Sequence, residues 1–215
     1  MSQYGLALHT ASAALGLAIA DQQGQGRSQV WDLGRETSNQ LHQYLVDFLA
    51  PQTWADLAFL AVAQGPGGFT GTRLGVVTAR TLAQQLDLPV FAISTLAACA
   101  WQAAKTLPDP TTAIALQMRA QREEVFGAIY QFTTTPAGQP QLHTLFPDTV
   151  MPTAQWETHL AQQPFSYHFV AADTNLASAI PELLELAIAA WHHGDRPHWS
   201  TALPFYGQHP VTNPA

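Results

Sequence analysis

The sequence has few of the residues on which several classes of protein depend. Its 215 residues include one cysteine, Cys99, which excludes an internal disulfide and any zinc site built from four thiolates. One lysine and seven arginines stand against fifteen acidic residues, for a net charge of −7. This balance argues against sequence-independent nucleic-acid binding, because such binding depends on basic side chains that neutralise phosphates.

Long apolar segments are also missing. No uninterrupted apolar run approaches the roughly 18–20 residues that are needed to span a bilayer, and the first residues carry no basic segment followed by an apolar one. We therefore expect a soluble cytoplasmic protein with no membrane contact. The apolar fraction of 47% is enough for a core, and the length allows one large or two small domains.

Apolar runs and amphipathic stretches alternate along the first half of the chain and predict an α/β fold. The expected order is β-β-β-α-β-α-β-α. The strands are expected at 4–8, 14–20, 28–33, 57–63 and 89–93, and the helices at 38–49, 72–86 and 95–105.

A Pro-Asp-Pro break at 108–110 separates this half from a second set of elements. These are expected strands at 112–117, 125–132 and 167–171, helices at 153–162 and 176–191, and room for an edge strand within 133–152. Because both halves place strands before a helix, we expect two lobes. The first is residues 1–106, the second and smaller is 107–190, and the C-terminal segment 191–215 packs back on the first.

A glycine-rich loop lies between the strand at 57–63 and the helix that follows. It consists of Gly65, Pro66, Gly67, Gly68, Phe69, Thr70 and Gly71. The loop has no lysine for a Walker motif, and Thr70 stands where the dinucleotide fingerprint needs its third glycine. Since it matches neither phosphate-binding motif, we interpret it as a tight turn that lets helix and strand pack closely.

Three other features are weak candidates for a catalytic or metal site. His9 ends the first strand, where site residues often lie, but a lone histidine there is more often structural. His192, His193 and His198 have only Asp195 near them, which favours a polar tail over a metal site. Glu123 and Glu124 are adjacent and would point to opposite faces of a strand, so a two-carboxylate hydrolase is unsupported. We predict no catalytic, cofactor-binding or metal-binding residue.

The helix after the loop carries small residues at every fourth position, Gly75, Ala79 and Ala83. Small residues let another helix approach closely. They could pack on the sheet of their own lobe, but Leu74, Val77 and Leu82 could do so instead and leave the stripe free. We predict that the helices at 38–49 and 72–86 form a contact with a partner. The expected interface residues are Leu41, Tyr44, Leu45, Phe48, Arg73, Gly75, Val76, Ala79, Arg80 and Ala83.

The run Gly65-Pro-Gly-Gly-Phe-Thr-Gly-Thr-Arg-Leu-Gly-Val76, with Thr78-Ala-Arg, Leu88-Pro-Val and Ser94-Thr-Leu after it, closely resembles the bacterial TsaB family, also called YeaZ. The resemblance covers roughly residues 4–130. It implies an actin-like ATPase (ASKHA, ribonuclease H-like) fold of two lobes. It also implies a non-catalytic scaffold or activator of the complex that makes N6-threonylcarbamoyladenosine at position 37 of ANN-decoding tRNAs.

The resemblance further implies the partners. TsaD is the catalytic paralogue, TsaE is a P-loop ATPase, and TsaC or its homologue supplies threonylcarbamoyl-adenylate. It implies a homodimer when the chain is alone, tRNA contact only through the complex, and ATP or ADP only at a joint interface. The alternative is an enzyme of the actin-like superfamily, either a peptidase or an ATP-binding phosphotransferase. A stand-alone nucleic-acid binder is disfavoured by the acidic charge.

The chain departs from the family pattern at three places. The usual Ile-Asp-Thr-Ser after the first strand is Leu8-His-Thr-Ala11, so His9 stands where actin-like ATPases use an acid for magnesium. The second-lobe motif has Glu123 in place of a glycine. The usual C-terminal Pro-Leu-Tyr-Leu-Arg is reduced to Pro204-Phe-Tyr-Gly-Gln208, which puts in doubt any contact made by the final arginine.

Overall fold

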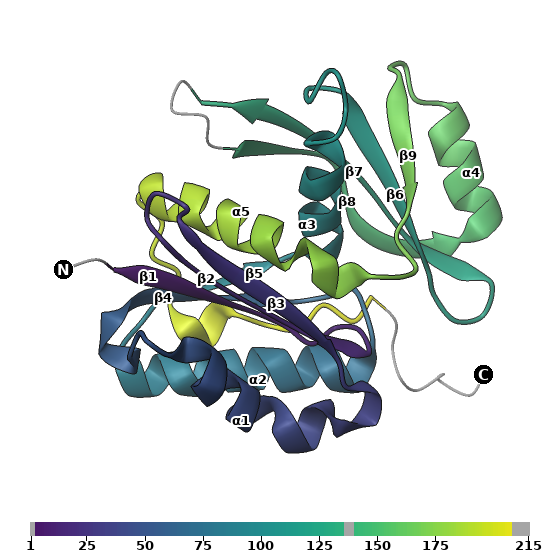
Figure 1. Cartoon of the computed structure of the whole chain (residues 1–215). Coiled ribbons are helices and arrows are strands. Elements are labelled where there is room, and N and C mark those ends of the chain that lie inside the picture. Colours follow the sequence, from purple (N-terminus) through teal and green to yellow (C-terminus); the bar gives the residue numbers. More distant parts are fainter. Residues whose placement is uncertain (1–2, 136–139, 208–215) are drawn as a thin grey trace.

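The computed structural model describes residues 3–135 and 140–207 and contains two β-sheets with helices between and outside them (Figure 1). The first sheet has the order β3-β2-β1-β4-β5. Its strands are β1 (Tyr4–His9), β2 (Ala14–Asp21), β3 (Gly26–Asp32), β4 (Leu57–Ala63) and β5 (Val90–Ile93). The pairs β1–β2 and β2–β3 are antiparallel, whereas β1–β4 and β4–β5 are parallel.

Helices cover both faces of this sheet, which explains why its central strands are apolar on both sides. On one face lie α1 (Thr37–Leu49) and α2 (Phe69–Leu86), packed on Leu6 and Leu8 of β1. On the other face lies α5 (Ile180–His192), packed on Ala7 and Phe59. Helix α3 (Thr95–Ala104) lies between α5 and the second sheet (Figure 1).

The second sheet has the order β8-β7-β6-β9. Its strands are β6 (Ala113–Arg119), β7 (Glu124–Thr134), β8 (Pro140–Pro152) and β9 (Tyr167–Ala171), with only β6 and β9 parallel. Helix α4 (Thr153–Ala161) covers the outer face through Trp156, which is fully buried. Strand β8 lies at the edge of this sheet, where the sequence analysis allowed an edge strand within residues 133–152.

These two sheets and their helices form a mixed α/β fold, as the sequence predicts. The expected elements are present, and the bounds of two of them shift by three residues or more. Helix α2 begins at Phe69 because the second half of the glycine loop forms its first turn. The helix expected at 176–191 is divided into a 3-10 turn, Leu176–Ala179, and α5, whose second residue is Pro181. Proline suits the first turn of a helix because it has no N–H to donate.

The C-terminal part returns to the first sheet. The Phe205 N–H donates to the Gln64 carbonyl at 2.7 Å, and the Val90 N–H donates to the Pro197 carbonyl at 3.1 Å. The division at residues 106 and 190 stays a prediction, and α5, which it places in the second lobe, packs on the first sheet. No helix in the described residues is long and apolar enough to cross a membrane.

Candidate functional site

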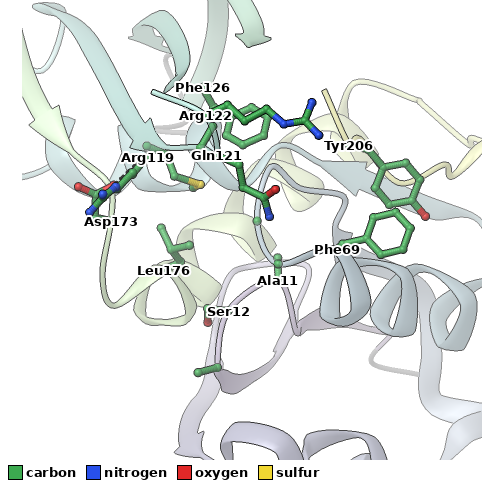
Figure 2. Close-up of a pocket in the computed structure, with 15 residues that line it drawn as sticks. Ala11, Ser12, Phe69, Arg119, Gln121, Arg122, Phe126, Asp173, Leu176 and Tyr206 are labelled. Atoms are coloured by element: carbon green, nitrogen blue, oxygen red, sulfur yellow. Dashed lines mark hydrogen bonds between the residues drawn. The ribbon is translucent and has the colours of Figure 1, made fainter. Parts of the chain in front are cut away.

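A cleft of about 870 Å³ lies between the lobes (Figure 2). Its first-lobe wall consists of the β1–β2 turn and the glycine loop, and its second-lobe wall consists of the β6–β7 turn. The lining residues are Ala11, Ser12, Ala13, Gly67, Gly68, Phe69, Met118, Arg119, Ala120, Gln121, Arg122, Phe126, Asp173, Leu176 and Tyr206.

The glycines of the loop bring the start of α2 against the β1–β2 turn. A Cβ atom at Gly67 would collide with the carbonyl oxygen of Ala11, and one at Gly71 would collide with that of Thr10. The Thr10 hydroxyl donates to the Gly71 carbonyl at 2.7 Å, and the Gly68 N–H donates to the Ala11 carbonyl at 2.7 Å. This is the close packing of helix and strand that we predict from the loop, and it leaves no room for side chains.

The second-lobe wall carries the charge of the cleft. Arg119 and Arg122 flank Gln121, and both salt bridges in the described residues are made by Lys105, so neither arginine has an ionic partner there. The carboxylate of Asp173 accepts the backbone N–H of Arg119 at 2.6 Å. Figure 2 shows Arg122 extending past Phe126 toward Tyr206.

The β6–β7 turn has an unusual backbone. Arg122 and Glu123 have φ angles of 58° and 60°, a left-handed conformation that glycine adopts more readily. Glu123 is the position where the pattern quoted above has glycine, and its backbone is in the conformation that favours glycine. On the facing side, the rings of Phe69 and Tyr206 lie 4.6 Å apart between centroids.

His9 is buried outside the lining of the cleft. It is 1% exposed, and neither ring nitrogen has a hydrogen-bond partner in the structure. Burial lowers the pKa of His9 to about 4, so the imidazole is neutral near pH 7. A neutral imidazole is a poor replacement for the carboxylate that Mg²⁺ prefers.

The predicted interface residues lie mostly inside the lobe. The buried ones are Leu41, Leu45, Phe48, Gly75, Val76, Ala79 and Ala83. Tyr44 is half-buried with its ring centroid 4.9 Å from that of Trp31, and Arg80 is half-buried over Trp199. Arg73 is exposed.

The expectation that the small stripe of α2 is free is therefore wrong. Gly75 faces the Thr10 side chain so closely that a Cβ atom would collide with its hydroxyl. Ala79 and Ala83 belong to the same buried cluster as Leu41 and Leu45 of α1. The stripe is small because α2 packs tightly against its own lobe. Val77, which we expected on the sheet side, is instead 51% exposed.

Three apolar side chains of these helices do remain exposed, Phe69 at the edge of the cleft and two others farther along. Phe69 and Val77 of α2 are 46% and 51% exposed, and Val46 of α1 is 56% exposed. The helices lie side by side on one face of the sheet (Figure 1). Exposed apolar area of this kind often marks an interface.

The histidines of the C-terminal part are not brought together. The ring of His192 bonds to the Gln22 carbonyl at 2.7 Å, and His198 bonds to the Ser200 hydroxyl at 2.7 Å. Within residues 3–135 and 140–207, no group of three or more histidine, cysteine or acidic side chains could hold a metal ion. His209 and Gln208 lie outside the described residues.

Comparison with known proteins identifies the family. The chain is 30% identical to the tRNA threonylcarbamoyladenosine biosynthesis protein TsaB of Bacillus subtilis over 178 residues, which cover 80% of this chain and 72% of that protein. This chain belongs to the TsaB (YeaZ) family. The TsaB protein of Escherichia coli is 30% identical over 128 residues, 59% of this chain and 54% of the relative.

Two further comparisons concern a related family model and the fold. The family model described as "TsaD: tRNA N6-adenosine threonylcarbamoyltransferase" matches residues 43–181. The structure of YeaZ from Pseudomonas aeruginosa superposes with a TM-score of 0.76 at 24% identity, covering 95% of this chain and 100% of that one. At this identity, the structural likeness establishes the fold alone.

Proposed function

We propose that this chain is a non-catalytic scaffold subunit of the complex that forms N6-threonylcarbamoyladenosine at position 37 of ANN-decoding tRNAs. The observation that carries the proposal is the match to TsaB of Bacillus subtilis over 80% of the chain. In this role the chain activates the catalytic TsaD subunit, works with the TsaE ATPase in the cytoplasm, and reaches tRNA only through the complex.

The chemistry of the cleft supports a subunit without catalysis of its own. Asp173 is the carboxylate that lines the cleft, and it accepts the Arg119 N–H. His9 replaces the magnesium-binding acid of actin-like ATPases and is buried and neutral. The glycines that could have approached a phosphate are instead packed on Thr10 and Ala11. We therefore propose that ATP or ADP binds only where this chain and a partner meet.

The exposed side of α1 and α2 is the proposed contact with TsaD. It carries Phe69, Val77 and Val46, with Arg73 between the two residues of α2. The sequence prediction placed the contact on the same two helices. The contact residues proposed here are exposed ones, because most of those predicted from the sequence are buried. A second copy of this chain can present the same face, so we propose a homodimer through it when TsaD is absent.

The test is co-purification of TsaD with the Val77→Glu variant. A charge at this position would be desolvated in the interface, so we expect TsaD to be lost while the isolated chain remains folded by circular dichroism. Val30→Glu is the matched control, because Val30 is 44% exposed on β3. If Val77→Glu retains TsaD at the wild-type level, the outer face of α2 is not the contact.

A second test concerns catalysis, because a peptidase or an ATP-binding phosphotransferase is the alternative function. We expect the isolated chain to hydrolyse neither ATP nor peptides. A clear turnover that a point substitution in this chain abolishes would contradict the scaffold proposal without bearing on the contact with TsaD.

A further inference from the structure

A second cavity, of about 670 Å³, lies away from the cleft and shares no lining residue with it. It is lined by the end of β5, the start of α3, strands β7 and β8, helix α5 and the C-terminal segment. Its apolar lining includes Leu186, Ala189 and Phe205. Nothing in the proposed scaffold role uses this cavity.

Polar side chains in its lining are held by hydrogen bonds. The Tyr130 hydroxyl donates to Asp148 Oδ1 at 2.5 Å and lies 3.4 Å from Ser94 Oγ. Ser94 is itself fixed as the N-cap of α3, where its side chain accepts the Ala97 N–H at 3.1 Å. Tyr130 is 4% exposed, so the aromatic ring is anchored in the core. The carboxylate of Asp148 is therefore held in a fixed position.

This carboxylate has no salt-bridge partner among residues 3–135 and 140–207. Lys105 makes both salt bridges in the described residues, and its partners are Glu182 and Glu185. Burial raises the pKa of Asp148, against the effect of the Ser94 and Tyr130 hydroxyls, which lower it. The cavity lining adds a second acid, Asp195, and one histidine, His193. Asp148 is half-buried beside an apolar cavity, and a bound cation would stabilise a carboxylate that has lost part of its contact with water.

We propose that this cavity binds a small organic cation, an ammonium or guanidinium group on a short apolar stem. The charged head would donate hydrogen bonds to the Asp148 carboxylate, which the Tyr130 hydroxyl positions. The stem would lie along Leu186, Ala189 and Phe205. A guanidinium suits the site best because its planar donors can engage both oxygens of a carboxylate. The cation can be a free molecule or the side chain of a partner protein.

The experiment is a calorimetric titration of the full chain with n-butylguanidinium, with n-butanol as the uncharged control. We expect saturable binding of the cation and at least tenfold weaker binding of the alcohol. The Asp148→Asn variant should weaken binding of the cation at least tenfold, because it removes the charge and keeps the shape. Asp173→Asn, which changes the carboxylate of the interlobe cleft, should leave binding unchanged.

Two further measurements keep the proposal decidable. Tyr130→Phe removes the hydroxyl that positions Asp148 and should weaken binding several-fold, which provides a test if Asp148→Asn does not fold. N-acetyl-L-arginine methylamide presents the same head on a peptide backbone. Binding of this probe but not of n-butylguanidinium would assign the site to a partner's side chain. Failure of both cations to bind, or undiminished binding to a folded Asp148→Asn variant, would overturn the proposal.

Discussion

Lys105 joins α3 to α5 through Glu182, with 2.9 Å between the ammonium nitrogen and the carboxylate oxygen Oε1. The same ammonium lies 2.8 Å from Glu185, whose other oxygen accepts the indole N–H of Trp101. The side chain of Glu182 is 9% exposed, and its second oxygen has no hydrogen-bond partner in the structure. The only lysine of the chain therefore neutralises a carboxylate that has little contact with water.

Lys105→Met should destabilise the fold by about 2–3 kcal/mol, because a buried carboxylate left without its cation is costly. Methionine keeps most of the apolar stem, so the loss reports the charge. The measurement is urea unfolding at pH 7. Glu185→Gln is the control, and it should cost less than about 1 kcal/mol because Glu185 is partly exposed. Equal losses in the two variants would show that burial of Glu182 is not the cause.

Arg27, which lies on strand β3, caps the C-terminal end of α1. One nitrogen of its guanidinium donates to the carbonyls of Phe48 at 2.7 Å and Ala50 at 2.8 Å, and the group lies 5.1 Å from the centroid of the Phe48 ring. Arg27→Met should cost about 1–3 kcal/mol in urea unfolding, because it removes charged hydrogen bonds to carbonyls at the end of the helix, of which that of Phe48 is partly buried. Arg35→Met, at an exposed position, should stay within about 0.5 kcal/mol of wild type. A loss at Arg35 as large as that at Arg27 would count against the capping role.

His9 should make stability depend on pH. Its pKa is about 4 in the folded chain and near 6.5 when unfolded, so below pH 6.5 the unfolded chain binds the extra proton. The contribution of neutral His9 to the free energy of unfolding is fully present above pH 6.5. It is lost as the pH drops through 4, and the total loss is about 3 kcal/mol.

The check on His9 is urea unfolding of wild type and His9→Leu at pH 7.5 and pH 5. The acidic side chains contribute equally to both proteins, so the difference between their pH dependences isolates His9. We expect a shallower loss for His9→Leu on going to pH 5. Parallel losses would mean that His9 takes up its proton in the folded state as readily as in the unfolded one.

Ala79→Glu should unfold the first lobe and so cannot serve to test a partner contact. Ala79 is 2% exposed, and a glutamate there would place a charge in the core between α1, α2 and the sheet. We expect a loss of several kcal/mol or more. Thr81→Glu, on the exposed side of the same helix, should be close to neutral. Circular dichroism melts of the two variants distinguish them, and a stable Ala79→Glu protein would contradict the packing of α2.

The sequence predicts elements well where local pattern decides them and poorly where contacts distant in sequence decide them. The strand at 57–63 and the strand at 167–171 are found with their bounds, because apolar runs between turn signals define them. The predicted orientation of α2 was wrong, because periodicity shows which residues share a face of a helix but not whether that face is buried or exposed. Its direction depends on the contact between Gly75 and Thr10, far apart in the chain.

The two cavities were also out of reach of sequence reasoning. The sequence singles out the glycine loop as a packing turn, and only the structure shows that Gly67, Gly68 and Phe69 of this loop line the interlobe cleft. The pair of Tyr130 and Asp148 gave no signal, because it forms only when β7 and β8 pair in register. Ser94 belongs to the Ser94-Thr-Leu motif, but the motif does not indicate that Ser94 lies beside this pair.

Helix α5 has a consequence for how the molecule comes apart. Leu183 on this helix lies in one continuous apolar cluster with Phe59 of the first sheet and Ile114 and Leu116 of the second. Neither lobe can expose its inner face without exposing the other's. The chain should therefore melt in a single cooperative transition, and the slowest-exchanging amides of β4 and β6 should share one opening free energy.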